Sequence, residues 1–123
     1  MPLEKHPDCI ESCNDCALAC DFCAHASLAG TDVAMLSRCI KLNIDCATIC
    51  RLAVAAMGRG SELTVEICAL CAEACDVCAY ECERHDFDHC RWCAAACRRT
   101  AEACRHMGVV APRTVQSIPM SAH

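Results

Sequence analysis

Cysteine spacing is the feature of this sequence that points most directly to chemistry. Seventeen of the 123 residues are cysteine. Within 9–23 and again within 68–82, cysteines recur at alternating intervals of three and four residues. Residues three and four apart lie on one face of an α-helix, so these intervals predict continuous cysteine stripes. Two intervals, 39–46 and 97–104, are seven residues long, which is the sum of three and four and keeps the same face. All seventeen cysteines then follow the spacing: Cys9, Cys13, Cys16, Cys20, Cys23, Cys39, Cys46, Cys50, Cys68, Cys71, Cys75, Cys78, Cys82, Cys90, Cys93, Cys97 and Cys104.

A buried stripe of thiols predicts metal binding. Cysteine can pack as a small apolar residue, but leucine or isoleucine would bury more apolar area at each position of such a stripe. A continuous stripe also offers no defined disulfide pairing. Thiolates suit Cu(I), Zn(II) and iron–sulfur clusters. Zinc and iron–sulfur ligands usually come as compact groups in loops, whereas stacked pairs on helices suit a column of Cu(I) ions. The pattern favours storage of several Cu(I) ions, with a zinc buffer or an iron–sulfur carrier as alternatives.

Four helical segments are expected to position these stripes. Glycine, proline and capping residues predict helices over about 8–28, 32–57, 62–84 and 88–107. Because connections this short make neighbouring helices antiparallel, the prediction is an all-α, up-down-up-down antiparallel four-helix bundle over 1–108 with a cysteine-lined core. The bundle is expected to be helical without metal. Residues 109–123 contain Pro112 and Pro119 and are predicted to form an extended or disordered tail.

Composition argues against several other classes of protein. The net charge is −5, and no basic run suggests a nucleic-acid partner. No apolar run approaches the ~20 residues that a membrane span needs. No cysteine stands apart as an activated nucleophile, so we expect no enzyme, and a thiol redox protein is the weakest alternative. The first residues contain no apolar stretch typical of a signal peptide, which predicts the cytosol, where thiols stay reduced.

Four motifs carry a more specific likeness. They are Cys9-Ile-Glu-x-Cys13-x-x-Cys16, Cys39-Ile-Lys-Leu-Asn-x-x-Cys46-Ala-x-x-Cys50, Glu66-Ile-Cys-Ala-Leu-Cys-Ala72 and His85-Asp-x-Asp-His-Cys90. In spacing and in intervening residues, the sequence resembles the cytosolic copper storage proteins. The resemblance implies a thiolate-filled four-helix bundle, a homotetrameric assembly and sequestration of Cu(I) in the bacterial cytosol.

An access site for metal is expected at one end of the bundle. His85 and His89 continue the stripe of the third helix at the connection to the fourth helix. The up-down topology places Met35 at this same end. Histidine and methionine are neutral, exchangeable ligands that can pass copper inward, and the resemblance also implies an open end lined by such residues. We therefore assign His85, His89 and Met35 to the access site.

The stripes have two interruptions and a closed end. Ser27 and Thr100 stand where the spacing would place further thiols. Hydroxyl groups are poor Cu(I) ligands, so we expect these two positions to weaken or interrupt binding. Met57 and Met107 continue two stripes at the end opposite the access site, where flexible methionine side chains are expected to plug the core.

Overall fold

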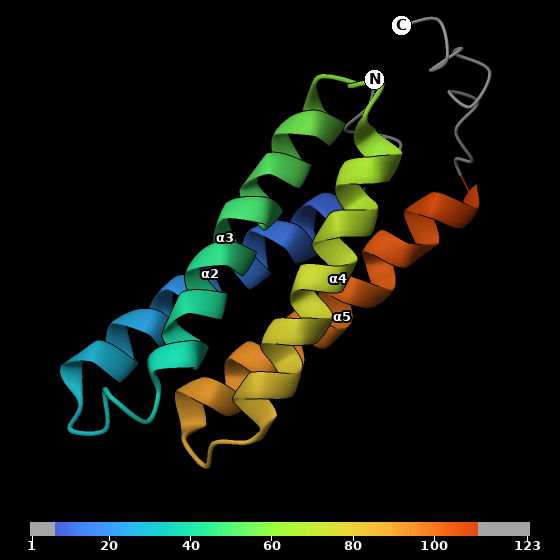
Figure 1. Cartoon of the computed structure of the whole chain (residues 1–123). Coiled ribbons are helices and arrows are strands. Elements are labelled where there is room, and N and C mark those ends of the chain that lie inside the picture. Colours follow the sequence, from blue (N-terminus) through green and yellow to red (C-terminus); the bar gives the residue numbers. More distant parts are fainter. Residues whose placement is uncertain (1–6, 111–123) are drawn as a thin grey trace, which may run out of the picture.

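Four α-helices make up the part of the chain that the computed structural model describes, residues 7–110. They are α2 (Pro7–Ala29), α3 (Ser37–Gly58), α4 (Thr64–Glu83) and α5 (Asp88–Val110). Both α2 and α4 pack against α3 and α5. Figure 1 shows the α2–α3 and α4–α5 connections at one end of the molecule and the α3–α4 connection at the other. The predicted all-α, up-down-up-down antiparallel four-helix bundle is confirmed.

The end of α3 is fixed by a left-handed glycine. Gly60 has a φ of 65°, which L side chains rarely adopt. Its N–H donates to the carbonyl oxygen of Met57 at 3.3 Å, and the Ser61 N–H donates to that of Ala56 at 2.9 Å. These two bonds form a Schellman motif. The motif satisfies the last carbonyl groups of α3 and turns the chain toward α4.

The start of α3 differs from the sequence prediction. The helix begins at Ser37, whereas a start at 32 was expected from a polar cap. Residues 32–36 instead form a separate turn, in which the Leu36 N–H donates to the Asp32 carbonyl oxygen at 3.0 Å. Leu36 directly precedes the helix without a side-chain cap, and its side chain is buried. Packing of Leu36 therefore sets the entrance to α3, and a capping hydroxyl or carboxylate does not.

Two other helix ends differ more modestly. The fourth helix was expected to end near Gly108, but α5 continues through this glycine to Val110. The third helix was expected to begin at 62, but α4 begins at Thr64. Before it, the Ser61 hydroxyl accepts a hydrogen bond from the Leu63 N–H at 3.0 Å. Residues 111–123 of the predicted tail lie outside the described residues.

The core is built from small side chains. All seventeen cysteines are free and buried. Alanines such as Ala53 and Ala79, both fully buried, fill positions beside them. Met57 and Met107 are buried at the α3–α4 end, as the sequence predicted. Because cysteine and alanine are short, the helices can approach closely and bring their sulfur atoms to a common axis.

Surface ion pairs connect neighbouring helices but add little stability. Arg51 of α3 lies 2.6 Å from Asp21 of α2, and Asp76 of α4 lies 3.1 Å from Arg98 and 2.6 Å from Arg105 of α5. Exposed pairs of this kind contribute up to ~1 kcal/mol each. The fold therefore depends mainly on the packing of its sulfur-rich core.

Candidate metal centre

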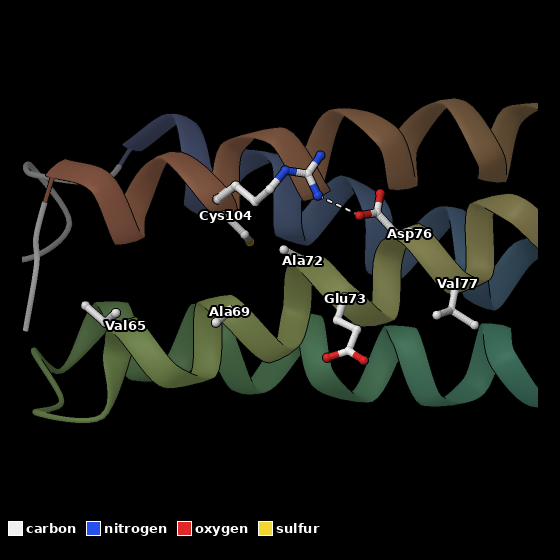
Figure 2. A pocket seen from close by; sticks show the side chains of 8 residues that line it. Val65, Ala69, Ala72, Glu73, Asp76, Val77 and Cys104 are labelled. Carbon is white, nitrogen blue, oxygen red and sulfur yellow. Dashed lines mark hydrogen bonds and ion pairs between the residues drawn. The ribbon is translucent and has the colours of Figure 1, made fainter.

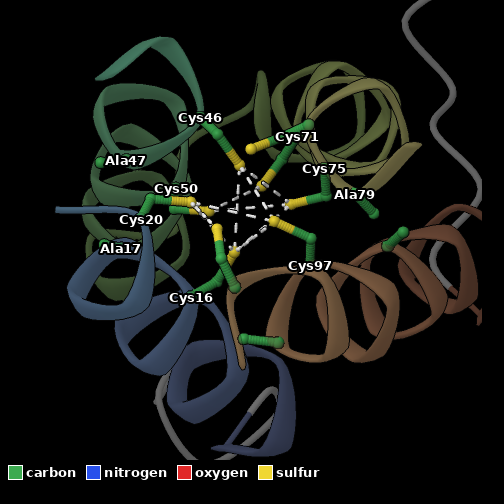
Figure 3. Packing of buried hydrophobic residues seen from close by; sticks show 14 of the residues in the cluster. Cys16, Ala17, Cys20, Cys46, Ala47, Cys50, Cys71, Cys75, Ala79 and Cys97 are labelled. Carbon is green, nitrogen blue, oxygen red and sulfur yellow. Dashed lines mark hydrogen bonds between the residues drawn. The ribbon is translucent and has the colours of Figure 1, made fainter. Parts of the chain in front are cut away.

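Thiols from all four helices meet on the bundle axis. The sulfur of Cys16 (α2) lies 3.5 Å from that of Cys97 (α5), 3.9 Å from that of Cys46 (α3) and 3.8 Å from that of Cys75 (α4). Figure 3 shows these side chains pointing toward one another from the surrounding helices. The centre of the core is thus a cluster of sulfur atoms in mutual contact, without a disulfide bond.

Similar contacts continue toward both ends of the bundle. From the α3–α4 end to the opposite end, further sulfur pairs are Cys9–Cys104 at 3.7 Å, Cys13–Cys104 at 3.7 Å, Cys50–Cys71 at 3.6 Å, Cys20–Cys93 at 3.6 Å, Cys39–Cys82 at 3.5 Å and Cys23–Cys90 at 3.9 Å. The predicted stripes therefore combine into a column of thiols that runs along the axis.

Several groups of thiols are compact enough to share an ion. In each group all sulfur atoms lie within 4.8 Å of one another. Two four-thiol groups with no member in common are Cys16–Cys46–Cys50–Cys75 and Cys20–Cys78–Cys93–Cys97, and two three-thiol groups are Cys9–Cys13–Cys104 and Cys23–Cys39–Cys90. Two sulfurs on one ion, with bonds of ~2.3 Å as in zinc thiolates, lie at most ~4.6 Å apart. The groups could therefore receive soft metal ions with little rearrangement.

Burial favours the protonated form of the thiols. Burial, together with the charge of Cys39, raises the pKa of Cys90 to about 12. Hydrogen bonds with Cys16 and Cys20 raise the pKa of Cys97, and burial acts in the same direction. An arriving metal ion must displace these protons, because the ligand is the thiolate.

Asn43 is a polar member of the core that the sequence analysis missed. It is fully buried, and its Oδ1 accepts hydrogen bonds from the thiols of Cys78 at 3.2 Å and Cys93 at 3.3 Å. The signal was present in the spacing, since Asn43 takes the place of a thiol in the pattern Cys39-x3-Asn43-x2-Cys46. The neutral amide thus gives neighbouring thiols an oxygen acceptor in a core made largely of sulfur.

The two predicted interruptions of the stripes are both buried. Thr100 is fully buried, and its hydroxyl donates to the backbone carbonyl oxygen of Ser12 at 2.9 Å. This bond directs the hydroxyl toward the α2 backbone and links α5 to α2. Ser27 is 1% exposed, and its hydroxyl has no hydrogen-bond partner among the described residues. That these positions weaken metal binding stays a prediction.

The three residues assigned to the access site have different surroundings. Nδ1 of His89 lies 3.3 Å from the sulfur of Cys23 and 3.6 Å from that of Cys90, so this ring touches the end of the thiol column. The side chain of His85 is 10% exposed and lies beside Glu81. Met35 is 56% exposed in the α2–α3 turn. His89 is therefore in direct contact with thiols, whereas Met35 faces solvent.

A groove lies on the surface between α4 and α5, near the α3–α4 end. It has a volume of about 390 Å³, and Val65, Ala69, Glu73 and Val77 are among its lining residues. Figure 2 shows these residues along α4, with Cys104 of α5 at the wall. The groove lies beside the thiol column, and Cys104 belongs to both.

Comparisons with known proteins give the arrangement a family context. The sequence model of a family described as copper storage protein matches residues 3–109. An uncharacterized cysteine-rich protein of Bacillus subtilis, YhjQ, is 50% identical over 71 residues, which are 57% of this chain and 66% of the relative, so the match spans about two thirds of that relative's length.

Solved structures match over most of the chain. A Cu(I)-bound copper storage protein, BsCsp3, is 48% identical with a TM-score of 0.80, and the match covers 87% of this chain and 98% of that one. A cytosolic copper storage protein from Streptomyces lividans, solved with five coppers, is 38% identical with a TM-score of 0.81. That match covers 86% of this chain and 93% of the other.

We expect the reduced, metal-free protein to be helical at pH 7 and to lose stability as the pH rises above about 9. The pKa of Cys90 rises from 9.0 to about 12 in the folded chain, so the unfolded chain releases its protons first. The stabilisation from such a thiol is fully present below the unfolded pKa and is lost as the pH rises toward the folded pKa. The loss is ~1.4 kcal/mol per pH unit per thiol.

Thermal unfolding followed by far-UV circular dichroism between pH 7 and 10, under anaerobic conditions, measures this dependence. Cys90→Ser provides a matched control, because serine does not ionise in this range. The slope of the unfolding free energy against pH should therefore decrease by the contribution of one proton, ~1.4 kcal/mol per pH unit. A melting temperature that stays constant or rises above pH 9 would contradict the prediction, as would a coil spectrum at pH 7.

Proposed function

The chain belongs to the copper storage protein family, and from this premise we propose that it stores several Cu(I) ions as thiolate complexes inside its four-helix bundle. The observation that carries the proposal is the column of buried thiols, with neighbouring sulfurs 3.5 to 4.0 Å apart along the axis. The proposed ligands are the seventeen cysteines identified in the sequence.

Charge balance favours Cu(I) as the cargo. Each thiol releases a proton when it binds, and one thiolate neutralises one monovalent ion. A zinc ion held by four thiolates would leave two negative charges in a core whose polar amide, Asn43, is neutral. Uncompensated charge in such a core is costly, so storage of Cu(I) is favoured over the zinc-buffer alternative. Thiolate is also among the soft ligands that select Cu(I).

Burial of the thiols favours a storage protein over an enzyme. The most exposed cysteine, Cys9, is only 5% exposed, whereas a catalytic thiol is usually accessible and activated by nearby positive charge. The Streptomyces lividans relative with five coppers is described as cytosolic, and the same compartment is proposed here, because it keeps thiols reduced. None of the helices within residues 7–110 is long and apolar enough to span a membrane.

Anaerobic titration with Cu(I) against a chromogenic chelator tests the proposed function. The reduced protein should take up several ions per chain, with a stoichiometry near or above the count of seventeen cysteines. A Cys16→Ser, Cys46→Ser, Cys75→Ser, Cys97→Ser variant, which removes the central cluster, should bind fewer ions. Saturation at one or two ions, or preferential recovery of zinc or iron from cells, would reject copper storage.

We propose that copper enters the column at the end formed by the α2–α3 and α4–α5 connections. His89 supports this assignment because its Nδ1 touches the thiols of Cys23 and Cys90 while the ring remains partly exposed. His85 lies at the same end, four residues before it. Met35 belongs to the proposed site as an outer ligand, and its exposed side chain could receive an ion from solvent.

The double variant His85→Ala, His89→Ala should slow Cu(I) uptake in stopped-flow measurements without lowering the final stoichiometry, because the inner thiols remain. Met35→Leu should have a smaller effect. His25→Ala serves as the matched control, since His25 is an exposed histidine on the outer face of α2. Equal uptake rates in the double variant and the wild type would exclude these histidines as the route of access.

We further propose that the protein forms a homo-oligomer, a tetramer by likeness to its family. Leu63, Leu70 and Val77 recur every seven residues at α4 and are 51%, 48% and 38% exposed. A row of exposed apolar side chains is typical of an interface. Light scattering should give four times the chain mass of 13.3 kDa, and Leu70→Glu should lower it. A wild-type monomer at micromolar concentration would contradict the assembly.

A further inference from the structure

Glu81 is a buried carboxylate at the access end of the bundle. Its residue exposure is 4%, and it lies in the last turn of α4, one turn before His85. Fully or nearly buried glutamates are rare unless they are paired. The partners of Glu81 therefore indicate what holds this charge in place and what the charge does there.

The two oxygens of Glu81 have separate partners. Oε2 lies 2.8 Å from Nε2 of His85. Oε1 lies 3.2 Å from Nη1 of Arg84 and 3.6 Å from Nη1 of Arg38. Both arginines are about three-fifths exposed, so they cover the carboxylate from the solvent side. The histidine, at 10% exposed, covers it on the side of the bundle end.

The contact with Oε2 determines where the proton of a neutral His85 ring lies. A carboxylate can only accept hydrogen bonds, so Nε2 must carry the proton and donate it. In a neutral imidazole the other nitrogen, Nδ1, then has a free lone pair. This is the form in which histidine binds a metal through Nδ1, with a carboxylate holding the other ring nitrogen.

The thiol column ends close to His85, whose backbone N–H donates to the carbonyl oxygen of Cys82 at 3.1 Å. The sulfur of Cys39 lies 3.5 Å from that of Cys82. His85 therefore stands where the thiol stripe of α4 ends, one turn beyond Cys82.

The ring of His89, at the same end of the bundle, is oriented by a different kind of neighbour. Its Nδ1 already contacts the sulfurs of Cys23 and Cys90 at 3.3 and 3.6 Å, and its ring stacks on Phe87 with the centroids 5.4 Å apart. The orientation of His89 therefore depends on an aromatic neighbour, whereas that of His85 depends on a carboxylate.

We propose that Glu81 is a positioning residue for copper uptake, which holds His85 with Nε2 protonated and leaves Nδ1 free to bind an arriving Cu(I) ion. The proposal rests on the proposed access function of His85. Arg38 and Arg84 pair with the other oxygen of Glu81 and leave Oε2 to the histidine. Glu81 itself contacts no copper.

Long-range 1H–15N NMR of the histidine rings tests the position of the proton without copper. At pH 8, above the ordinary histidine pKa of ~6.5, the reduced wild-type protein should show His85 with Nε2 protonated, assigned by loss of its signals in His85→Ala. Glu81→Ala should give a mixture of both tautomers for His85 and leave His89 unchanged. Glu81→Gln should keep the wild-type form, because the glutamine oxygen still accepts a hydrogen bond. An unchanged His85 tautomer in Glu81→Ala would overturn the proposal.

Stopped-flow uptake of Cu(I) separates positioning from attraction by charge. Loss of an outer-shell partner commonly costs ~10-fold or more in metal binding or activity, so Glu81→Ala should slow uptake about as much as His85→Ala. The pair Glu81→Ala, His85→Ala should be no slower than His85→Ala alone, and Glu81→Gln should remain near wild type. Slow uptake by Glu81→Gln, or further slowing by Glu81→Ala in the His85→Ala background, would point to attraction by charge and contradict positioning.

Two further variants test whether Glu81 is only a link between helices and whether His85 takes part in copper access. Arg38→Met removes the link between α3 and α4 but keeps the Glu81–His85 contact, so it should preserve both the tautomer and the uptake rate. If Arg38→Met slows uptake as much as Glu81→Ala does, Glu81 is only a link between helices and the proposal fails. If His85→Ala takes up copper at the wild-type rate, the access function of His85 fails, whereas the NMR result still decides whether Glu81 fixes the ring.

Discussion

Contact between sulfur atoms on a common axis is the constraint on which the rest of this structure depends. A thiol can reach the axis only from a helix whose stripe neither drifts around its surface nor lies far from its neighbours. Alternating intervals of three and four residues meet the first condition. The second requires small side chains beside the thiols, and alanines such as Ala53 and Ala79 meet it. The same constraint explains why, among the described residues, cysteine and alanine occupy the middle of the core in place of bulky apolar residues, although leucine would contribute more to stability there.

Because of this constraint, most of the fold could be predicted from the sequence. Periodicity identifies the inward face of each helix, and short connections fix the antiparallel order, so both the architecture and the burial of the cysteines were predictable. Helix ends were less predictable, because competing local interactions decide them. Leu36 is buried where a polar cap was expected, and Gly108 remains helical where a helix end was expected.

The candidate site was predictable in its sulfur atoms and less so in its oxygen atoms. Asn43 lies within the thiol spacing, but an asparagine on a helix is ordinarily solvent-facing, and only its contacts with Cys78 and Cys93 reveal it as part of the core. Glu81 is four residues before His85, which is also the spacing of an ordinary surface pair. Its significance depends on burial and on Arg38 from another helix, and neither is encoded in a local pattern.

The two ends of the thiol column differ, and this asymmetry has a consequence for the order in which cargo moves. Buried Met57 and Met107 close the α3–α4 end, while partly exposed histidines occupy the other. If metal passes only through the histidine end, ions near Cys39 and Cys90 must leave before those near Cys9 and Cys104 can do so. The bundle would then work as a last-in, first-out store. Its outer ions would form a pool that exchanges quickly with the surroundings, and its inner ions would form a reserve that is drawn on only after the outer pool is empty.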